Sequence, residues 1–169
     1  MTHAGTLEET ALWKYYSKKL KNDPERVGWT KKVCEAACDY LKAVRDSFAN
    51  FTLHDGTHVL NVLDALAGLL GEQINSLSEG VAELLLLAAA LHDLGMVYAP
   101  DDPSCFADGD RLRQYTEALR PRLRGKRPED WAEADRADFR RWLHPFRVDA
   151  VLEQPEWREL MDRRPKDAV

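Results

Sequence analysis

One segment constrains the fold more than any other, the run SLSEGVAELLLLAAALHDLG at residues 76–95. Its apolar residues surround a helical axis almost completely, which is typical of a helix buried at the centre of a protein. Ser76 and Glu79 have the spacing of a capping box, and Gly95 is a residue type that commonly ends a helix. The apolar stretch contains Glu83 and is too short to cross a bilayer. The segment therefore predicts a buried central helix.

Helical spacing of apolar residues recurs along the rest of the chain, and no run alternates as a strand would. Pro24 and Gly28, in the segment KNDPERVGW, predict a break between the first two helices. A turn-rich segment at 98–110 follows the central helix. The expected fold is an all-α, compact helical bundle forming a single domain over residues 1–169. Besides the central helix, we expect helices at about residues 7–20, 30–48, 58–74, 111–119, 129–143, 146–152 and 156–161.

Composition limits the cellular location and the binding partners that we expect for the chain. The 169 residues carry a net charge of −5, which argues against a surface devoted to coating nucleic acid. The first residues lack the layout of a signal peptide, so we expect a cytoplasmic protein without a membrane partner. The three cysteines fit reduced, buried thiols better than a disulfide framework or a zinc site.

Basic residues gather in the C-terminal half of the chain. They fit either a solvated helix face and loop or a positive rim that attracts a phosphate-bearing substrate. Between positions 111 and 127 they are Arg111, Arg113, Arg120, Arg122, Arg124, Lys126 and Arg127.

Histidines lie at the predicted ends of helices. His54 and His58 are four residues apart in HDGTH, and His92 precedes Asp93 at the end of the central helix. Imidazole and carboxylate groups both bind divalent metals such as Mn²⁺, Fe²⁺, Co²⁺ or Zn²⁺. A carboxylate at the end of a buried helix also costs desolvation free energy unless a cation compensates it. The alternative is that Asp93 faces solvent and simply ends the helix.

The joint spacing of these residues resembles the HD superfamily of metal-dependent phosphohydrolases. His58 and Val62 are followed by LHDLG at residues 91–95, and the similarity covers residues 50–147. The resemblance implies that His58, His92 and Asp93 hold one or two divalent metal ions (Mn, Fe, Co, Mg or Zn). The segments FTLHDGTH and LLLLAAALHDLGM are most similar to the HD-CE group, which is associated with bacterial conflict systems.

The resemblance also implies roles for residues around the metal. In HD-type cyclic-nucleotide phosphodiesterases, a histidine four residues before the first ligand protonates the leaving group, and that position is His54 here. Arg141 and His144 form an R-x-x-H pattern similar to that of several HD enzymes, in which the histidine contacts phosphate or a second metal. His54 and His144 are therefore the candidate catalytic residues, and Arg141 and Arg147 are candidates for binding substrate phosphate.

Two departures from the family pattern bear on the completeness of the site. HD enzymes usually supply a further aspartate well downstream, but here only Asp149, Asp162 and Asp167 follow His144. Either the chain belongs to a longer protein with further domains, or the site closes in another way, or the domain is catalytically degenerate. In addition, Met96 stands where some HD branches carry a lysine.

The sequence as a whole predicts a metal-dependent phosphohydrolase or phosphodiesterase. Its expected substrate is a small-molecule phosphoester, above all a nucleotide, attacked by a metal-activated water. The alternative is a catalytically degenerate HD-like module that binds nucleotide or a partner protein. A helical nuclease acting on nucleic acid is a third possibility, which the basic residues between positions 111 and 127 keep open.

Overall fold

The computed structural model describes residues 5–44, 56–98, 103–166 and 168, and every regular element in these ranges is a helix. The predicted all-α class is therefore confirmed. Within the same ranges, no helix combines the length and apolarity that a membrane span requires. The described α-helices are α1 (Ala11–Lys19), α2 (Pro24–Leu41), α4 (Gly56–Leu70), α5 (Glu79–Leu91), α6 (Gly109–Ala118), α7 (Glu133–Leu143), α8 (Val148–Leu152) and α9 (Pro155–Asp162). The 3-10 turns are η1 (Leu7–Glu9), η2 (Gly71–Ser76), η3 (Leu94–Met96), η4 (Pro103–Phe106), η5 (Pro121–Leu123), η6 (Pro128–Asp130) and η7 (His144–Phe146).

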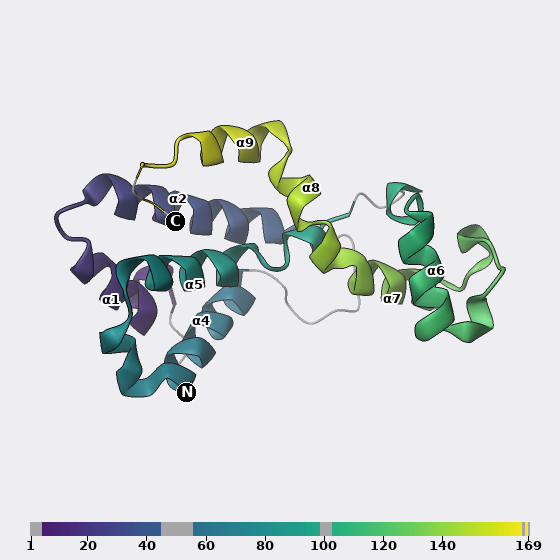
Figure 1. The fold of residues 1–169 in the computed structure, drawn as a ribbon, viewed down its shortest axis with the longest axis horizontal. Coiled ribbons are helices and arrows are strands. Elements are labelled where there is room, and N and C mark those ends of the chain that lie inside the picture. Colours follow the sequence, from purple (N-terminus) through teal and green to yellow (C-terminus); the bar gives the residue numbers. More distant parts are fainter. Residues whose placement is uncertain (1–4, 45–55, 99–102, 167, 169) are drawn as a thin grey trace.

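Helices α1, α2, α4 and α5 form the core of the larger of two lobes (Figure 1), and α5 lies at its centre, as its apolar sequence predicts. It packs against α1, α2 and α4 (Figure 1). Ala82, Leu86 and Ala90 on its inner side are completely buried. The opposite side is exposed at Val81 and Leu84, so the helix is covered on most but not all of its circumference.

Several of the predicted helix boundaries are wrong, among them the starts of α2 and α5. The predicted break between the first two helices exists, between Lys19 and Pro24, but it is shorter than the segment KNDPERVGW. Asp23 caps α2 by accepting a hydrogen bond from the Arg26 N–H, and Pro24, well before the predicted start, is its first residue. Proline suits that position because the first turn needs no N–H donor. Helix α5 is capped by Ser78, which accepts from the Val81 N–H, whereas the hydroxyl of the predicted cap Ser76 donates to a carbonyl within η2.

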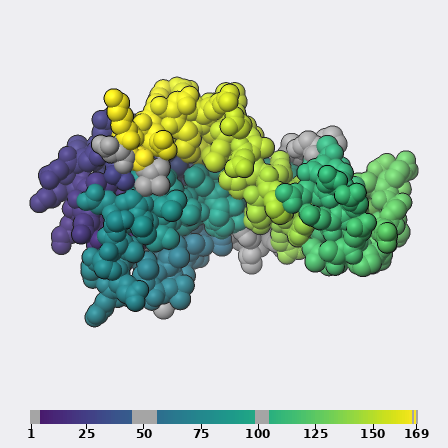
Figure 2. Space-filling model, viewed as in Figure 1, coloured from purple at the N-terminus to yellow at the C-terminus, as the bar shows by residue number. Residues whose placement is uncertain are grey.

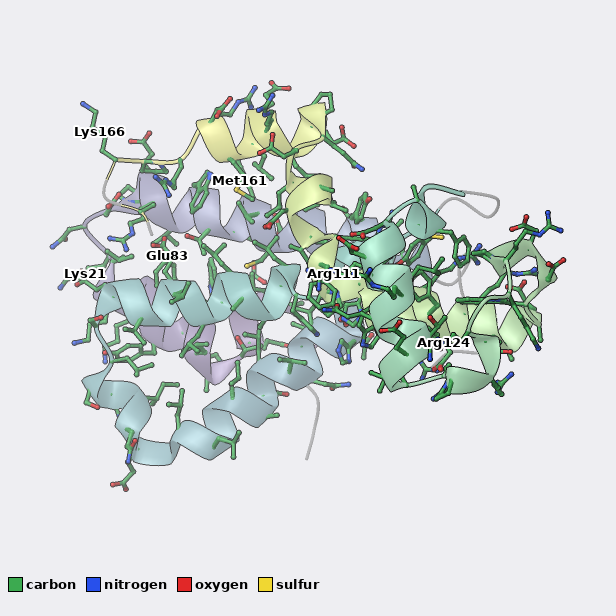
Figure 3. The ribbon with its side chains drawn as sticks, turned by 45° about the vertical axis from the view of Figure 1, so that its right-hand side comes forward. Lys21, Glu83, Arg111, Arg124, Met161 and Lys166 are labelled. Atoms are coloured by element: carbon green, nitrogen blue, oxygen red, sulfur yellow. The ribbon has the colours of Figure 1, made fainter. Side chains whose placement is uncertain are left out.

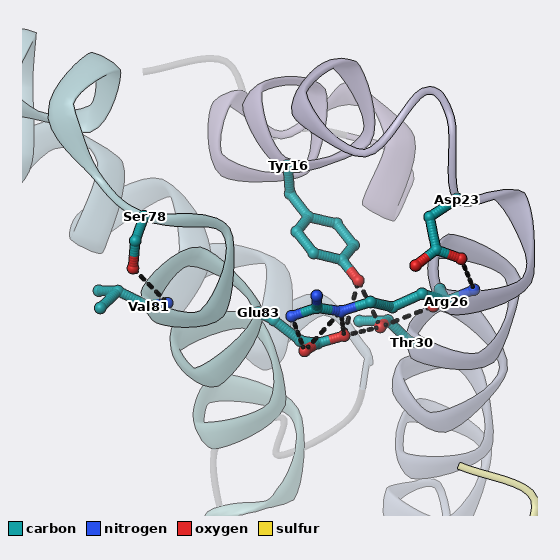
Figure 4. Close-up of polar contacts among 7 residues, drawn as sticks. All are labelled: Tyr16, Asp23, Arg26, Thr30, Ser78, Val81 and Glu83. Carbon is teal, nitrogen blue, oxygen red and sulfur yellow. Dashed lines mark hydrogen bonds and ion pairs between the residues drawn. The ribbon is translucent and has the colours of Figure 1, made fainter. Parts of the chain in front are cut away.

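A buried ionic network joins α1, α2 and α5 in the larger lobe (Figure 4). The carboxylate of Glu83 on α5 has no exposed surface, and the Arg26 guanidinium from α2 donates to both of its oxygens at 2.7 to 3.2 Å. The hydroxyls of Tyr16 on α1 and Thr30 on α2 donate to Glu83 Oε1 at 2.7 and 2.8 Å. Because its lone pairs are so well occupied, this carboxylate can remain charged in the interior.

A second, smaller lobe extends along the long axis of the molecule and comprises residues 103–143 (Figures 1 and 2). We call it the aromatic lobe, because ring stacking and edge contacts around Phe139 hold it together. Tyr115 contributes both a ring contact with Phe139, at 5.0 Å between centroids, and a hydroxyl that donates to Asp138. Helix α7, the last element of this lobe, passes through η7 into α8, which leads to the larger lobe.

The basic residues at positions 111–127 all lie in the aromatic lobe, where Figure 3 labels two of them, Arg111 and Arg124. The Arg111 guanidinium carbon lies 3.7 Å from the centroid of the Phe146 ring, a cation–π contact. Other arginines of this segment form ion pairs with nearby carboxylates, namely Arg113, Arg120, Arg122, Arg124 and Arg127. These carboxylates balance much of the positive charge of the segment.

Candidate metal centre

The ends of four helical elements converge on one site. His58 lies in the first turn of α4, and His92 directly follows the last residue of α5. Asp93 comes next, immediately before η3, and His144 is the first residue of η7. Figure 1 shows the start of α4 beside the end of α5, close to where α7 passes into α8. The sequence predicted that these side chains belong together, and the fold brings all four into one place.

His58, His92 and Asp93 present three ligand atoms to a common point. Asp93 Oδ2 lies 3.2 Å from His58 Nε2 and 3.0 Å from His92 Nε2. The two imidazole Nε2 atoms are 3.3 Å apart. Two histidine nitrogens and one carboxylate oxygen are a suitable donor set for a divalent transition metal, and three protein ligands leave positions for water or substrate.

The ring of His92 is oriented by the backbone of its own helix. Its Nδ1 lies 3.0 Å from the carbonyl oxygen of Ala89, one turn earlier in α5. In the neutral ring, Nδ1 therefore carries the proton and donates it to this carbonyl. The Nε2 lone pair then faces Asp93, which is the orientation that a metal ligand needs.

The charge state of Asp93 also fits a cation-binding site. Burial raises the pKa of this carboxyl, but the imidazoles of His144 and His92 beside it outweigh burial and hold the pKa well below its usual range. In turn, the neighbouring Asp93 carboxylate raises the pKa of His92. Asp93 is thus an anion at neutral pH, although its side chain is only 5% exposed.

One atom of Asp93 tests whether these residues fit a metal ion. Among the described residues, the buried Oδ2 has no partner with hydrogen-bond geometry, although two imidazole nitrogens lie near it. A buried charged oxygen without such a partner is costly. Because Oδ2 and both nitrogens face the same point, a shared cation would satisfy all three atoms at once. The donor set therefore fits a divalent metal.

His144 lies on the other side of the same carboxylate. Its Nε2 is 3.3 Å from Asp93 Oδ1, and its Nδ1 contacts the carbonyl oxygen of Arg141 one turn earlier. A close backbone approach sets this position, because Gly95 in η3 packs directly against the His144 carbonyl. The sequence suggested Gly95 only as a helix stop, whereas its lack of a side chain is what allows η3 and η7 to meet.

The two predicted phosphate-binding arginines have structural contacts. Arg147 donates from Nη1 to the carbonyl oxygens of Gly95 and Val97 at 3.0 and 3.2 Å, and it stacks 3.7 Å from the centroid of the Tyr98 ring. Arg141 donates to Asp138 Oδ1 at 2.9 Å. Arg147 thus holds the segment that follows Asp93, and a role in binding substrate stays a prediction for both arginines.

The remaining sequence predictions for the site fall elsewhere. His54, the candidate proton donor, lies outside the described residues, as does Asp167. Asp149 and Asp162 are exposed, and neither joins the group of potential ligands found in the described part of the chain. Met96, at the position where some HD branches carry a lysine, is buried in the core.

Comparison with known proteins agrees with this geometry. An all-helical fold that gathers two histidines and an aspartate at adjoining helix ends defines an HD-type domain. The sequence model of the HD-CE family matches residues 48–168, which is most of the chain, and the protein therefore belongs to the HD-CE family. No curated protein and no solved structure matches the chain.

Proposed function

We propose that this HD-CE domain is a metal-dependent phosphohydrolase that hydrolyses a phosphoester, with a nucleotide as the favoured substrate. The observation that carries the proposal is the convergence of His58, His92 and Asp93 on one point at the surface of the larger lobe. The two histidine side chains are 30% and 38% exposed, so a substrate can reach the side of the site opposite the buried Asp93.

Each side chain would have a distinct task in this reaction. A divalent cation held by His58, His92 and Asp93 would activate a water and offset charge on the phosphoryl oxygens. Asp93 would supply the negative charge, and the Ala89 carbonyl would keep the His92 ring in the ligating tautomer. His144, beside Asp93 Oδ1, is positioned to contact substrate phosphate or to exchange a proton with it.

Proton donation to the leaving group is proposed for His54, four residues before His58 in the sequence. An imidazole that is not a metal ligand keeps a pKa suited to this task. Replacing His54 with Ala should therefore slow turnover by about 10²- to 10⁴-fold while leaving metal content unchanged. Loss of the metal in that variant would assign His54 to the metal site instead.

Phosphate binding is proposed for Arg141 and Arg147. Arg141 is the better candidate for direct contact, because its side chain is 48% exposed and its ion pair with Asp138 can exchange with a phosphate. Arg147 already donates to two backbone carbonyls. Its contribution to substrate binding would therefore be smaller or indirect.

A second candidate is a module that binds nucleotide or a partner protein without catalysis. It is favoured by the small number of side chains that could bind a metal: in the described residues, no downstream aspartate joins His58, His92 and Asp93. Action on nucleic acid has less support, because carboxylates pair with most arginines of the aromatic lobe. The association of the HD-CE group with bacterial conflict systems makes a cytoplasmic role in defence part of the first proposal.

The deciding experiment compares the protein with its Asp93→Ala variant after loading with Mn²⁺. Hydrolysis of a panel of nucleotides and of bis(4-nitrophenyl) phosphate is measured for both, with Asp110→Ala as the matched control. Asp110 is an exposed aspartate in α6, outside the site. Hydrolysis lost only in Asp93→Ala supports the enzyme. Metal-dependent nucleotide binding without turnover would support the binding module, and turnover by Asp93→Ala would contradict the proposed site.

A further inference from the structure

Helix α1 and turn η2 enclose a second concave site, remote from the candidate metal centre. The cavity has a volume of about 560 Å³, which lies in the range of small-molecule sites. Three of its lining side chains are lysines on one face of α1, and no acidic residue lines it. The lining residues are Ala11, Lys14, Tyr15, Lys18, Lys19, Ile74 and Asn75.

These lysines are placed differently from the arginines of the aromatic lobe. Most of those arginines have carboxylate partners, as described above. Among the described residues, no carboxylate oxygen lies within 4.0 Å of the ammonium group of Lys14, Lys18 or Lys19, and Lys19 contacts only the ring face of Tyr15, 5.4 Å from its centroid. A chain with a net charge of −5 therefore concentrates uncompensated positive charge around one cavity.

Helix stability alone does not explain this arrangement. Lys18 and Lys19 lie in the last turn of α1, where cations interact favourably with the helix dipole. Lys14 is the fourth residue of the helix, near the end that disfavours a cation, and it lies one turn from Lys18. Like charges at this spacing repel each other and weaken a helix. A bound anion would turn this repulsion into attraction.

The walls of the cavity are held in place by contacts between its two elements. The Tyr15 hydroxyl donates to the Leu77 carbonyl oxygen at 2.6 Å, which ties α1 to the residue after η2. Gly71, with a φ of +50°, turns the chain from α4 into η2. The lysines therefore project around a fixed floor that includes Ile74 and part of the Tyr15 ring. Lys21, labelled in Figure 3, follows shortly after α1 and adds to the charge at this end of the molecule.

The cavity is separate from the metal centre. His58 lies at the start of α4, whereas Ile74 and Asn75 follow the end of the same helix. A helix of 15 residues is about 22 Å long. A small ligand in the cavity could not reach the metal ligands at the same time.

We propose that the cavity between α1 and η2 binds a compact anion that carries two or more linked phosphate groups. Three ammonium groups match the charge of a diphosphate or triphosphate better than that of a single phosphate. The polyphosphate can be inorganic or the tail of a nucleotide, and in the second case Ala11, Ile74 and the Tyr15 ring would contact the organic part. The ligand would occupy this site whether or not the metal centre is loaded.

Calorimetric titration tests this proposal without involving the metal centre. Inorganic tripolyphosphate, ATP and inorganic phosphate are titrated into the full chain in the presence of EDTA. The test variant is Lys14→Ala/Lys18→Ala, and the control is Lys32→Ala/Lys166→Ala, which removes the same charge from exposed positions outside the cavity. Thermal unfolding checks that both variants are folded.

We expect saturable binding of tripolyphosphate or ATP, weakened about tenfold or more in Lys14→Ala/Lys18→Ala and less than about twofold in the control. Binding should weaken with added salt, because the lysines are exposed. Tighter binding of ATP than of tripolyphosphate would identify a nucleotide as the ligand, and the reverse an inorganic polyphosphate. The proposal would be overturned by absence of binding below about 1 mM, by equal loss in both variants, or by equally tight binding of inorganic phosphate.

Discussion

The backbone carbonyl oxygen of His144 occupies the space where a side chain on residue 95 would begin: a Cβ added to Gly95 would lie 2.0 Å from it. Gly95 is two residues after Asp93, so this close approach of η3 to η7 positions His144 against the Asp93 carboxylate. Two segments that are distant in sequence thus meet behind the candidate metal centre.

Replacing Gly95 with Ala should move η7 away from η3 and destabilise the protein. Overpacking of this kind costs about 1–3 kcal/mol, and the contacting atoms are backbone, which cannot rotate aside. Urea unfolding measures the loss. Metal binding by His58, His92 and Asp93 should persist, whereas turnover that depends on His144 should fall.

Gly68→Ala is the matched control, because a Cβ at Gly68, inside α4, meets no atom within 4 Å. This variant should be more stable than the native protein by about 0.5–1 kcal/mol, since alanine loses less backbone entropy in a helix. Equal stability of Gly95→Ala and the native protein would show that η3 and η7 are not tightly packed.

Replacing Glu83 with Ala should destabilise the protein far more than a surface substitution. It leaves the Arg26 guanidinium buried without its partner and removes the acceptor for Tyr16 and Thr30. Breaking a buried ion pair on one side costs about 3–5 kcal/mol. Chemical denaturation gives the difference, with Glu72→Ala at an exposed position of η2 as control. A loss as small as that of the control would mean that the network contributes no stability.

Replacing Arg147 with Met distinguishes its structural role from substrate binding. The substitution removes the hydrogen bonds to Gly95 and Val97 and the stacking on Tyr98. Each such bond from a charged donor contributes about 1.5–3 kcal/mol, less where solvent replaces it. We expect a lower melting temperature even without substrate or metal. An unchanged melting temperature with a raised KM would instead make Arg147 a substrate-binding residue.

The stability of the metal-free protein should depend on pH through His92 and Asp93. The raised pKa of His92 contributes stability below the ordinary value of 6.5, and this contribution is lost as pH rises through the raised pKa. The lowered pKa of Asp93 contributes above the ordinary value of 3.8 and is lost as pH falls through the lowered pKa. Both contributions are therefore complete between these two values.

Unfolding in EDTA across a pH series checks this window. The native protein should exceed Asp93→Asn in stability by the largest margin between the ordinary pKa values of 3.8 and 6.5. The margin should shrink at higher pH, where His92 loses its proton and its attraction to Asp93. A margin that grows steadily above neutral pH in EDTA would contradict the assigned charge states.

Local sequence patterns were sufficient for the fold class and for singling out His92 and Asp93 as metal-binding candidates. The apolar residues 81–91 predict a central helix. His92 and Asp93 are neighbours in the sequence, so both lie at the end of this helix even if its predicted boundary is slightly shifted. The metal-binding role of His58 was inferred from motif spacing similar to that of the HD family and not from a physical argument about the residues around it. The place of His144 beside Asp93 depends on packing between η3 and η7, which no local pattern encodes.

The errors have local causes as well. Pro24 was interpreted as a helix breaker, although a proline after a capping residue such as Asp23 is a helix start. Glu83 was taken only as an interruption of an apolar run. A carboxylate at a position that helical periodicity buries predicts a buried basic partner, and Arg26 could have been sought on that ground. That Arg26 is this partner could be seen only from the packing of α2 against α5.

The central claim is that His58, His92 and Asp93 hold a divalent metal, and elemental analysis of the purified protein tests it most directly. The protein, Asp93→Ala and the control Asp110→Ala are each incubated with Mn²⁺ or Fe²⁺, desalted and analysed for metal per chain. We predict about one or two equivalents of metal per chain in the native protein and the control, and none in Asp93→Ala. Metal-free native protein, or equal metal in all three proteins, would contradict the claim.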